Sequence, residues 1–202
     1  MQTVTRRRAV WGLLVVTIVW GATFIWMKQA MNALQSEIDF YGQTAVVSVL
    51  VGGRFLIAAI ALFIGSSKAR AALREKELWS GGTVLGLILL VGFTTQMVGI
   101  DTISPSTSAF LTSLYVVFTA MISTKMTGQP VTRMMIAGVL LATFGAGFIE
   151  GPPHLSWGKG EILTVICAFF FALHIIFTQS ITQRMDPLGL SLIHISEPTR
   201  PY

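Results

Sequence analysis

The sequence predicts an all-α integral membrane protein, built as a bundle of several membrane-spanning helices. Apolar residues make up 53% of the 202-residue chain and charged residues only 11%, whereas soluble domains carry about 25% charged residues. The mean hydropathy is +0.71, and the few charged residues stand in short clusters between long apolar runs. A soluble domain of this length could not bury so much apolar surface, but a bilayer accepts it as solvent.

Six stretches are predicted to cross the membrane, because a spanning helix needs about 20 predominantly apolar residues. They are Val10–Met27, Thr44–Ile64, Gly82–Ile100, Thr107–Thr124, Met134–Phe148 and Glu161–Ile181. The fifth is short. Pro105 lies in the brief connection before the fourth stretch and suits a turn or the first position of a helix, where no amide hydrogen is needed.

The basic residues predict the orientation, because cytoplasmic loops of membrane proteins carry an excess of Lys and Arg. If the spans alternate, ten basic residues fall on the side of the N-terminus: Arg6, Arg7, Arg8, Lys68, Arg70, Arg74, Lys76, Lys125, Arg133 and Arg184. The opposite side holds Lys28 and Lys159, with several acidic residues nearby. We therefore expect a multi-pass protein of the cytoplasmic (inner) membrane with a cytoplasmic N-terminus.

Several chemistries find no support in the sequence. The net charge of +5 is spread over short loop clusters, so nucleic acid is not an expected partner. Cys167 is the only cysteine, which excludes an internal disulfide and a Cys-based zinc site. Neither a nucleotide-binding Gly-x-x-x-x-Gly-Lys-Ser/Thr loop nor a His-Glu-x-x-His metal motif occurs. We expect no cofactor, no metal and no catalytic residues, and the oligomeric state stays open.

The end of the chain differs in character from the rest. Leu190–Arg200 reads LSLIHISEPTR, and the whole string resembles the in-frame translation of a transposase-based sequencing adapter. We expect residues 190–202 to be a non-native tail, so that His194, Glu197 and Arg200 carry no function. The alternative is a genuine polar C-terminus.

A weak internal repeat links the first and sixth predicted spans. Residues 20–26, WGATFIW, resemble residues 171–177, FALHIIF. The two stretches lie five spans apart, so the second copy would run in the opposite direction, as in membrane proteins built from inverted repeats. The alternative is a chance likeness between two apolar helices.

Four stretches resemble the EamA family of the drug/metabolite transporter superfamily. They are Trp20–Phe24, Gly53–Ala59, the run from Thr107 to Ala120, and Gly128-Gln129 with Gly138 and Gly145–Gly147. Their order and spacing carry the likeness more than any single motif does. Two departures concern the subgroup: Val116-Val117 stand where the family often has Pro, and Gln129 stands where it often has Glu.

The resemblance implies ten helices in two inverted five-helix repeats. Residues 1–150 would form the first repeat and residues 151–189 would begin the second with one helix, so the remaining helices would be missing. It also implies a secondary transporter that exports small metabolites or drug-like molecules by alternating access, with the lipid bilayer and a small-molecule substrate as partners. The alternatives are a non-transporting membrane assembly or scaffold subunit, and a membrane-embedded enzyme.

Two ionisable residues deep in predicted spans are candidates for substrate contact. Arg54 lies about ten residues inside the second span, where a cation costs roughly 2.5 to 3.5 kcal/mol. It is either a counter-charge for an anionic or zwitterionic substrate or a structural arginine bonded to helix-end carbonyls. His174 lies in the sixth span and is either a proton-coupling group, since histidine titrates near neutral pH, or a neutral histidine bonded to a neighbouring helix.

Five further residues complete the candidate cavity. By the family resemblance, Trp20, Thr23 and Phe24 face a central cavity, and Gln96 and Tyr115 would add hydrogen bonds from the third and fourth spans. A few placed polar groups in an apolar cavity are how ligand sites gain specificity. Plain helix packing is the alternative for each aromatic residue.

Overall fold

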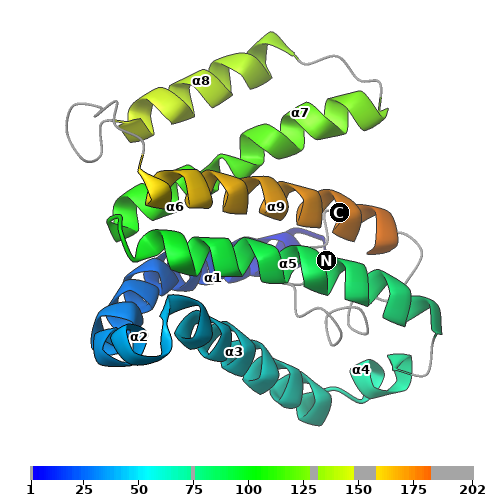
Figure 1. Ribbon diagram of the computed structural model, residues 1–202. Helices are drawn as coiled ribbons and strands as arrows, with labels where there is room; N and C mark the ends of the chain where they lie inside the picture. Colours follow the sequence, from blue (N-terminus) through cyan, green and yellow to red (C-terminus); the bar gives the residue numbers. More distant parts are fainter. Residues whose placement is uncertain (1, 74–75, 128–131, 148–157, 183–202) are drawn as a thin grey trace.

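The computed structural model describes residues 2–73, 76–127, 132–147 and 158–182, which form α-helices joined by short connections. The helices are α1 (Gln2–Ala33), α2 (Gln35–Tyr41), α3 (Gln43–Gly65), α4 (Ser67–Ala72), α5 (Lys76–Ile100), α6 (Pro105–Ser113), α7 (Tyr115–Thr127), α8 (Arg133–Gly147) and α9 (Lys159–Thr182). The long helices run in alternating directions, and α6 and α7 together form one traverse of the bundle (Figure 1). This is the multi-span helical bundle that the sequence predicts.

Five stretches of the described residues are long and apolar enough to cross a membrane. They are Val10–Ala33, Gln43–Gly65, Trp79–Ile100, Pro105–Thr124 and Lys159–Ile181. Each contains most or all of one predicted span, and the helices extend beyond the predicted ends. The polar residues that flank an apolar run continue the helix because the backbone remains hydrogen-bonded beyond the hydrocarbon core.

The fifth predicted span, Met134–Phe148, is helical over the residues described. It forms most of α8, which has 15 residues, fewer than the roughly 20 that span the hydrocarbon core. Phe148 lies outside the described residues, so a membrane crossing by this stretch stays a prediction. The α8 side chains whose burial is described are exposed, with Met134 at 85% and Leu141 at 78%.

The fourth predicted span is interrupted at Leu114, which separates α6 from α7. The amide of Leu114 bonds to the carbonyl of Leu111 at 3.2 Å, a bond one residue shorter than the α-helical repeat. The hydroxyl of Ser113 donates to the carbonyl of Phe110 at 2.6 Å, and such back-bonding by Ser and Thr often bends helices. At the start of α6, Ser104 caps the amide of Thr107 at 3.0 Å and Pro105 occupies the first turn, as its position predicts.

Two short helices, α2 and α4, were not predicted, because neither has the length of a spanning segment. α2 buries Ile38 and turns the chain back towards the bundle. Gly42 joins α2 to α3 with φ of 88°, a left-handed conformation that residues with a Cβ atom rarely adopt. The turn between the first two spans therefore depends on this glycine.

The closest helix pair joins α5 and α9, which lie side by side and antiparallel (Figure 1). Glycines make this approach possible, because a Cβ atom on Gly92 would lie 2.7 Å from the ring of Phe171. A Cβ on Gly99 would lie 2.9 Å from the carbonyl oxygen of Gly160, and one on Gly160 would collide with Thr102. Small residues commonly let helix backbones approach this closely in membrane proteins.

Burial is concentrated in the halves of α1 and α3 that lie next to α2. Met31 in α1 and Val47 in α3 are fully buried, whereas Trp11 towards the other end of α1 is 65% exposed and Ile64 at the other end of α3 is 72% exposed. The two helices therefore pack against α5 at one end and separate from it towards the other. A central core connects them to α5 and α9 through Phe93, Met97, Cys167 and Phe171.

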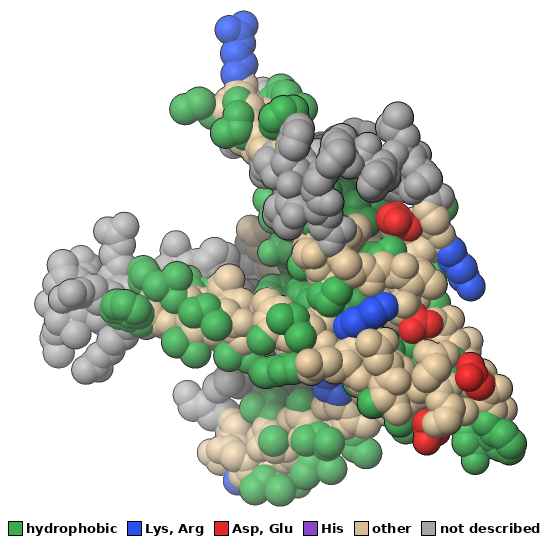
Figure 2. Space-filling model, turned by 90° about the vertical axis from the view of Figure 1, so that its left-hand side faces the viewer, with side chains coloured by type: hydrophobic (Ala, Val, Ile, Leu, Met, Phe, Trp, Pro, Cys, Tyr) green, Lys and Arg blue, Asp and Glu red, His purple; other side chains and the backbone are tan. Residues whose placement is uncertain are grey.

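A polar network joins α1, α3 and α5 at the closely packed end. The Nζ atom of Lys28 donates to the carbonyl oxygens of Ile100 at 3.0 Å and Asp101 at 2.5 Å. The Nε2 atom of Gln43 donates to the Asp101 carboxylate at 2.9 Å. Figure 2 looks onto this end of the molecule, where acidic side chains gather beside basic ones.

Candidate functional site

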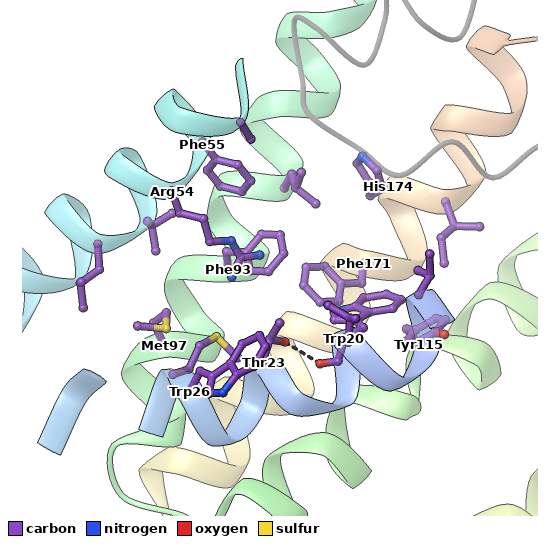
Figure 3. Close-up of a pocket in the computed structure, with 18 of the residues that line it drawn as sticks. Trp20, Thr23, Trp26, Arg54, Phe55, Phe93, Met97, Tyr115, Phe171 and His174 are labelled. Atoms are coloured by element: carbon purple, nitrogen blue, oxygen red, sulfur yellow. Dashed lines mark hydrogen bonds between the residues drawn. The ribbon is translucent and has the colours of Figure 1, made fainter. Parts of the chain in front are cut away.

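A cavity of about 1030 Å³ lies between α1, α3, α5 and α9, with Tyr115 of α7 at one side. Ligand pockets commonly measure roughly 300 to 1,000 Å³ and are lined mainly by apolar and aromatic side chains. Most of the lining here is aliphatic or aromatic, and the polar groups among the described residues are few: Thr23, Arg54, Tyr115, His174, Thr178 and Gln179. Figure 3 shows side chains from several helices converging on this space.

Arg54 is presented to the cavity from α3 and is exposed there. Its Cζ atom lies 4.3 Å from the ring centroid of Phe93 and 5.7 Å from that of Phe55 (Figure 3). A guanidinium within about 6 Å of an aromatic face is attracted by the ring quadrupole. The rings therefore hold the cation at the cavity wall without neutralising it.

The aromatic residues around Arg54 form a connected wall. Phe55 and Phe93 meet edge to face with centroids 5.3 Å apart, and Phe93 and Phe171 do so at 5.1 Å. Pairs at these distances favour edge-to-face geometry because the ring edge is positive and the face negative. Each ring fixes the next, so the surface behind the guanidinium has a defined shape.

A second aromatic pair bounds the cavity on the α1 side. The rings of Trp20 and Tyr115 are stacked, with centroids 6.4 Å apart and planes 25° apart. The Thr23 hydroxyl donates to the Trp20 carbonyl at 2.6 Å (Figure 3), so its lone pairs stay able to accept a hydrogen bond. The tryptophan ring and the threonine oxygen thus face the same space.

Five of the seven candidate residues lie around this cavity: Trp20, Thr23, Arg54, Tyr115 and His174. His174 belongs to α9 and is buried at 8% exposure. The structure brings these residues together from four helices, although Arg54 and His174 are far apart in the sequence. Their contact with a substrate stays a prediction.

Phe24, a further candidate, does not line this cavity. Each residue turns an α-helix by about 100°, so Phe24 points aside from its neighbour Thr23. Its side chain packs into the hydrophobic core instead, at 8% exposure. It is not among the side chains that line the cavity.

Gln96, the last candidate, does not line this cavity either. Its Nε2 atom donates to the Thr112 hydroxyl at 3.0 Å, which ties α5 to α6, and the residue is 1% exposed. Its Oε1 atom has no hydrogen-bond partner among the described residues. Gln96 was a candidate because it is polar. A polar side chain in a helix bundle can, however, hydrogen-bond to a neighbouring helix as readily as it can line a cavity.

Four aromatic cavity residues were missed: Trp26, Phe55, Phe93 and Phe171. Trp26 follows Thr23 by three residues and shares its helix face, so helical spacing from Trp20 and Thr23 would have found it. Phe93 and Phe171 carry no such signal, because a phenylalanine in an apolar helix looks the same whether it faces lipid, core or cavity.

The fold and the cavity together define a multi-pass helical membrane protein with a chamber inside its bundle. A family model described as the EamA-like transporter family matches residues 7–150. A protein of Archaeoglobus fulgidus named "Uncharacterized transporter" is 29% identical over 182 residues, which cover 89% of this chain and 52% of that protein. The chain thus spans about half the length of this curated relative. No solved structure matches the chain significantly.

The family match covers well over half of the chain, so the chain belongs to the EamA-like transporter family. The expectation drawn from the four sequence stretches is confirmed. The family is described as one of transporters.

Proposed function

We propose that this protein exports small metabolites or drug-like molecules across the cytoplasmic membrane by alternating access. The observation that carries the proposal is the aromatic cavity of about 1030 Å³ between the helices of a transporter-family chain. A chamber of that size fits an organic molecule rather than a bare ion.

The charge distribution supports a cytoplasmic N-terminus. Basic residues follow α3 and precede α8, at the same ends of the helices as the N-terminus, and cytoplasmic loops are rich in such residues. With that orientation, the end joined by Lys28, Gln43 and Asp101 faces outward. The cavity helices separate at the opposite end, so the cavity would open towards the cytoplasm.

The relative from Archaeoglobus fulgidus is about twice as long as the matched part of this chain, which supports a protein of two repeats. We propose that residues 1–150 form the first repeat and that α9 begins the second. Transporters of this plan bind substrate near the bilayer midplane where the repeats meet. The contribution of both α9 and the first-repeat helices to the cavity agrees with that plan.

The two rival classes have less support. A scaffold subunit needs no chamber, yet Arg54 lines one. A membrane-embedded enzyme needs clustered titratable groups, and the described residues contain no group of three or more His, Cys, Asp or Glu side chains suited to a metal. We therefore propose transport without catalysis, with a small-molecule substrate and the bilayer as partners.

The test compares the metabolites released by cells that express the gene with those released by cells that lack it. The proposal expects at least one compound to accumulate outside only when the gene is present. Replacing Trp20 or Arg54 by alanine should reduce that release at least tenfold, because each removes a cavity contact.

Trp11→Ala is the matched control for Trp20→Ala. Trp11 lies on the same helix, is 65% exposed and does not line the cavity, so its loss should leave release unchanged. Membrane insertion of all variants is checked by fractionation. Release that is unaffected by both cavity substitutions would defeat the site assignment, and identical profiles with and without the gene would defeat export itself.

A further inference from the structure

We propose that the cavity binds an organic monoanion, whose carboxylate pairs with Arg54 and whose flat apolar body lies against the aromatic walls. This inference deepens the proposed function and rests on it. It concerns the chemical class of the substrate, which family membership leaves open.

The first argument is charge. Among the described side chains that line the cavity, Arg54 carries the one permanent charge, and none is Asp or Glu. A guanidinium stays protonated at every physiological pH. The described lining therefore offers this positive charge no counter-charge, and an anion is the ligand that the charge favours.

The second argument is hydrogen bonding. A guanidinium has five N–H donors in a planar fork that matches a carboxylate. Within the described part of the chain, no hydrogen bond or ion pair involves Arg54, and its recorded contacts are the ring faces of Phe93 and Phe55 at 4.3 and 5.7 Å. The structural alternative, an arginine bonded to helix-end carbonyls, is what Arg70 does instead, with bonds to Phe63 and Ile64.

The third argument is the shape of the apolar wall. Trp20 and Tyr115 stack, Phe93 and Phe171 meet edge to face, and in the view of Figure 3 Phe171 lies between Phe93 and Trp20. Aromatic faces give the best packing to flat groups, which they contact over a wide area. A ligand anchored at Arg54 would extend its apolar part between these rings.

The same geometry disfavours a zwitterion. An ammonium group would bring a second positive charge into the chamber, where the described lining offers it no carboxylate. Like charges in a poorly screened site repel. The net charge of the ligand, and not only its carboxylate, should therefore decide its affinity.

The experiment measures binding to the purified protein by isothermal titration calorimetry with four matched probes. Phenylacetate is the anion, phenylacetamide its neutral analogue, phenylalanine the zwitterion and phenethylamine the cation. We expect phenylacetate to bind about 10- to 100-fold more tightly than the amide, the range that a charge-assisted hydrogen bond supplies. Phenylalanine and phenethylamine should bind more weakly still.

Three variants locate the effect. Arg54→Gln should bring phenylacetate down to the affinity of the amide while amide binding persists, which shows that the cavity is intact. Arg54→Lys keeps the charge but loses the planar fork, so it should retain part of the preference. Arg70→Gln removes the same charge outside the cavity and should change nothing.

A lipid phosphate offers the same chemistry as a carboxylate, so binding is compared in detergent and in nanodiscs that contain phosphatidylglycerol. We expect equal phenylacetate affinity in both. Loss of phenylacetate binding in the nanodiscs would show that the guanidinium of Arg54 binds a lipid headgroup instead, and would overturn the proposal. Equal affinity for anion and amide, phenylalanine binding as tightly as phenylacetate, or a preference that survives Arg54→Gln would overturn it as well.

Failure here is distinguishable from failure of the transport proposal. Charge-selective binding without release of any compound from cells would keep the site and defeat export. Export of neutral compounds that ignores Arg54 would keep transport and defeat the anion site.

Discussion

The ammonium of Lys28 caps the end of α5, where its Nζ atom lies 3.0 Å from the carbonyl oxygen of Ile100. The last carbonyls of a helix have no partner within the helix and carry its partial negative charge. A lysine from α1 therefore satisfies the end of α5, and the contact closes one end of the bundle.

Replacing Lys28 by methionine should weaken this closure. Methionine keeps an unbranched side chain of similar length but loses the charge-assisted bonds to Ile100 and Asp101. We therefore expect a loss of about 1.5 to 3 kcal/mol in the free energy of unfolding. Thermal unfolding of the purified protein in detergent measures it. Lys159→Met, at an exposed lysine of the same end, is the control, and an equal effect in both variants would contradict the capping role.

The bond between Gln43 and Asp101, at 2.9 Å, should contribute a measurable coupling between α3 and the end of α5. A double-mutant cycle with Gln43→Ala and Asp101→Ala isolates that term from the other effects of each substitution. We expect about 0.5 to 1.5 kcal/mol in unfolding free energy. Strictly additive single effects would show that the two side chains are neighbours without energetic coupling.

Adding one methyl group at Gly99 should disturb the contact between α5 and α9. The new Cβ atom would lie 2.8 Å from the Thr164 hydroxyl and 2.9 Å from the Gly160 carbonyl, and overpacking of this kind costs about 1 to 3 kcal/mol. Gly52→Ala is the control, because nothing lies within 4 Å of its added Cβ. Melting temperatures of the two variants should therefore shift by clearly different amounts, with Gly99→Ala the lower.

Replacing Gln96 by leucine should leave ligand binding intact. The amide lies outside the cavity lining and bonds to Thr112, so phenylacetate affinity should stay within a factor of two of the wild type, below about 0.5 kcal/mol. The change in stability should be small, under about 1.5 kcal/mol, because the substitution also removes the unpartnered Oε1 atom. A strong loss of phenylacetate affinity in calorimetry would show that Gln96 does take part in binding.

Much of the fold could be predicted, because long apolar runs and segregated basic residues mark spanning helices independently of their packing. Among the described residues, five of the six predicted spans form helices that are long and apolar enough to cross a membrane. The break at Leu114 and the helices α2 and α4 escaped prediction, because they depend on local hydrogen bonds such as that of Ser113. The predicted tail at residues 190–202 lies outside the described residues.

The candidate site was only partly predictable. Arg54 and Trp20 stand out because a charge or a large amphipathic ring is unusual inside a span. Phe24 and Gln96 lie outside this cavity, because a sequence does not say which face of each helix meets it. That choice depends on helix rotation, which packing partners set through contacts such as Gln96 with Thr112.

The glycine-lined contact between α5 and α9 also constrains how the chain is made. Gly92 and Gly99 of α5 meet residues of α9, which leaves the ribosome only after α6, α7 and α8. During biosynthesis the glycine face of α5 therefore has no α9 to pack against until α9 has been synthesised and inserted. A chain interrupted before α9 would carry this backbone-rich surface permanently towards lipid, where quality-control proteases or a second chain would meet it.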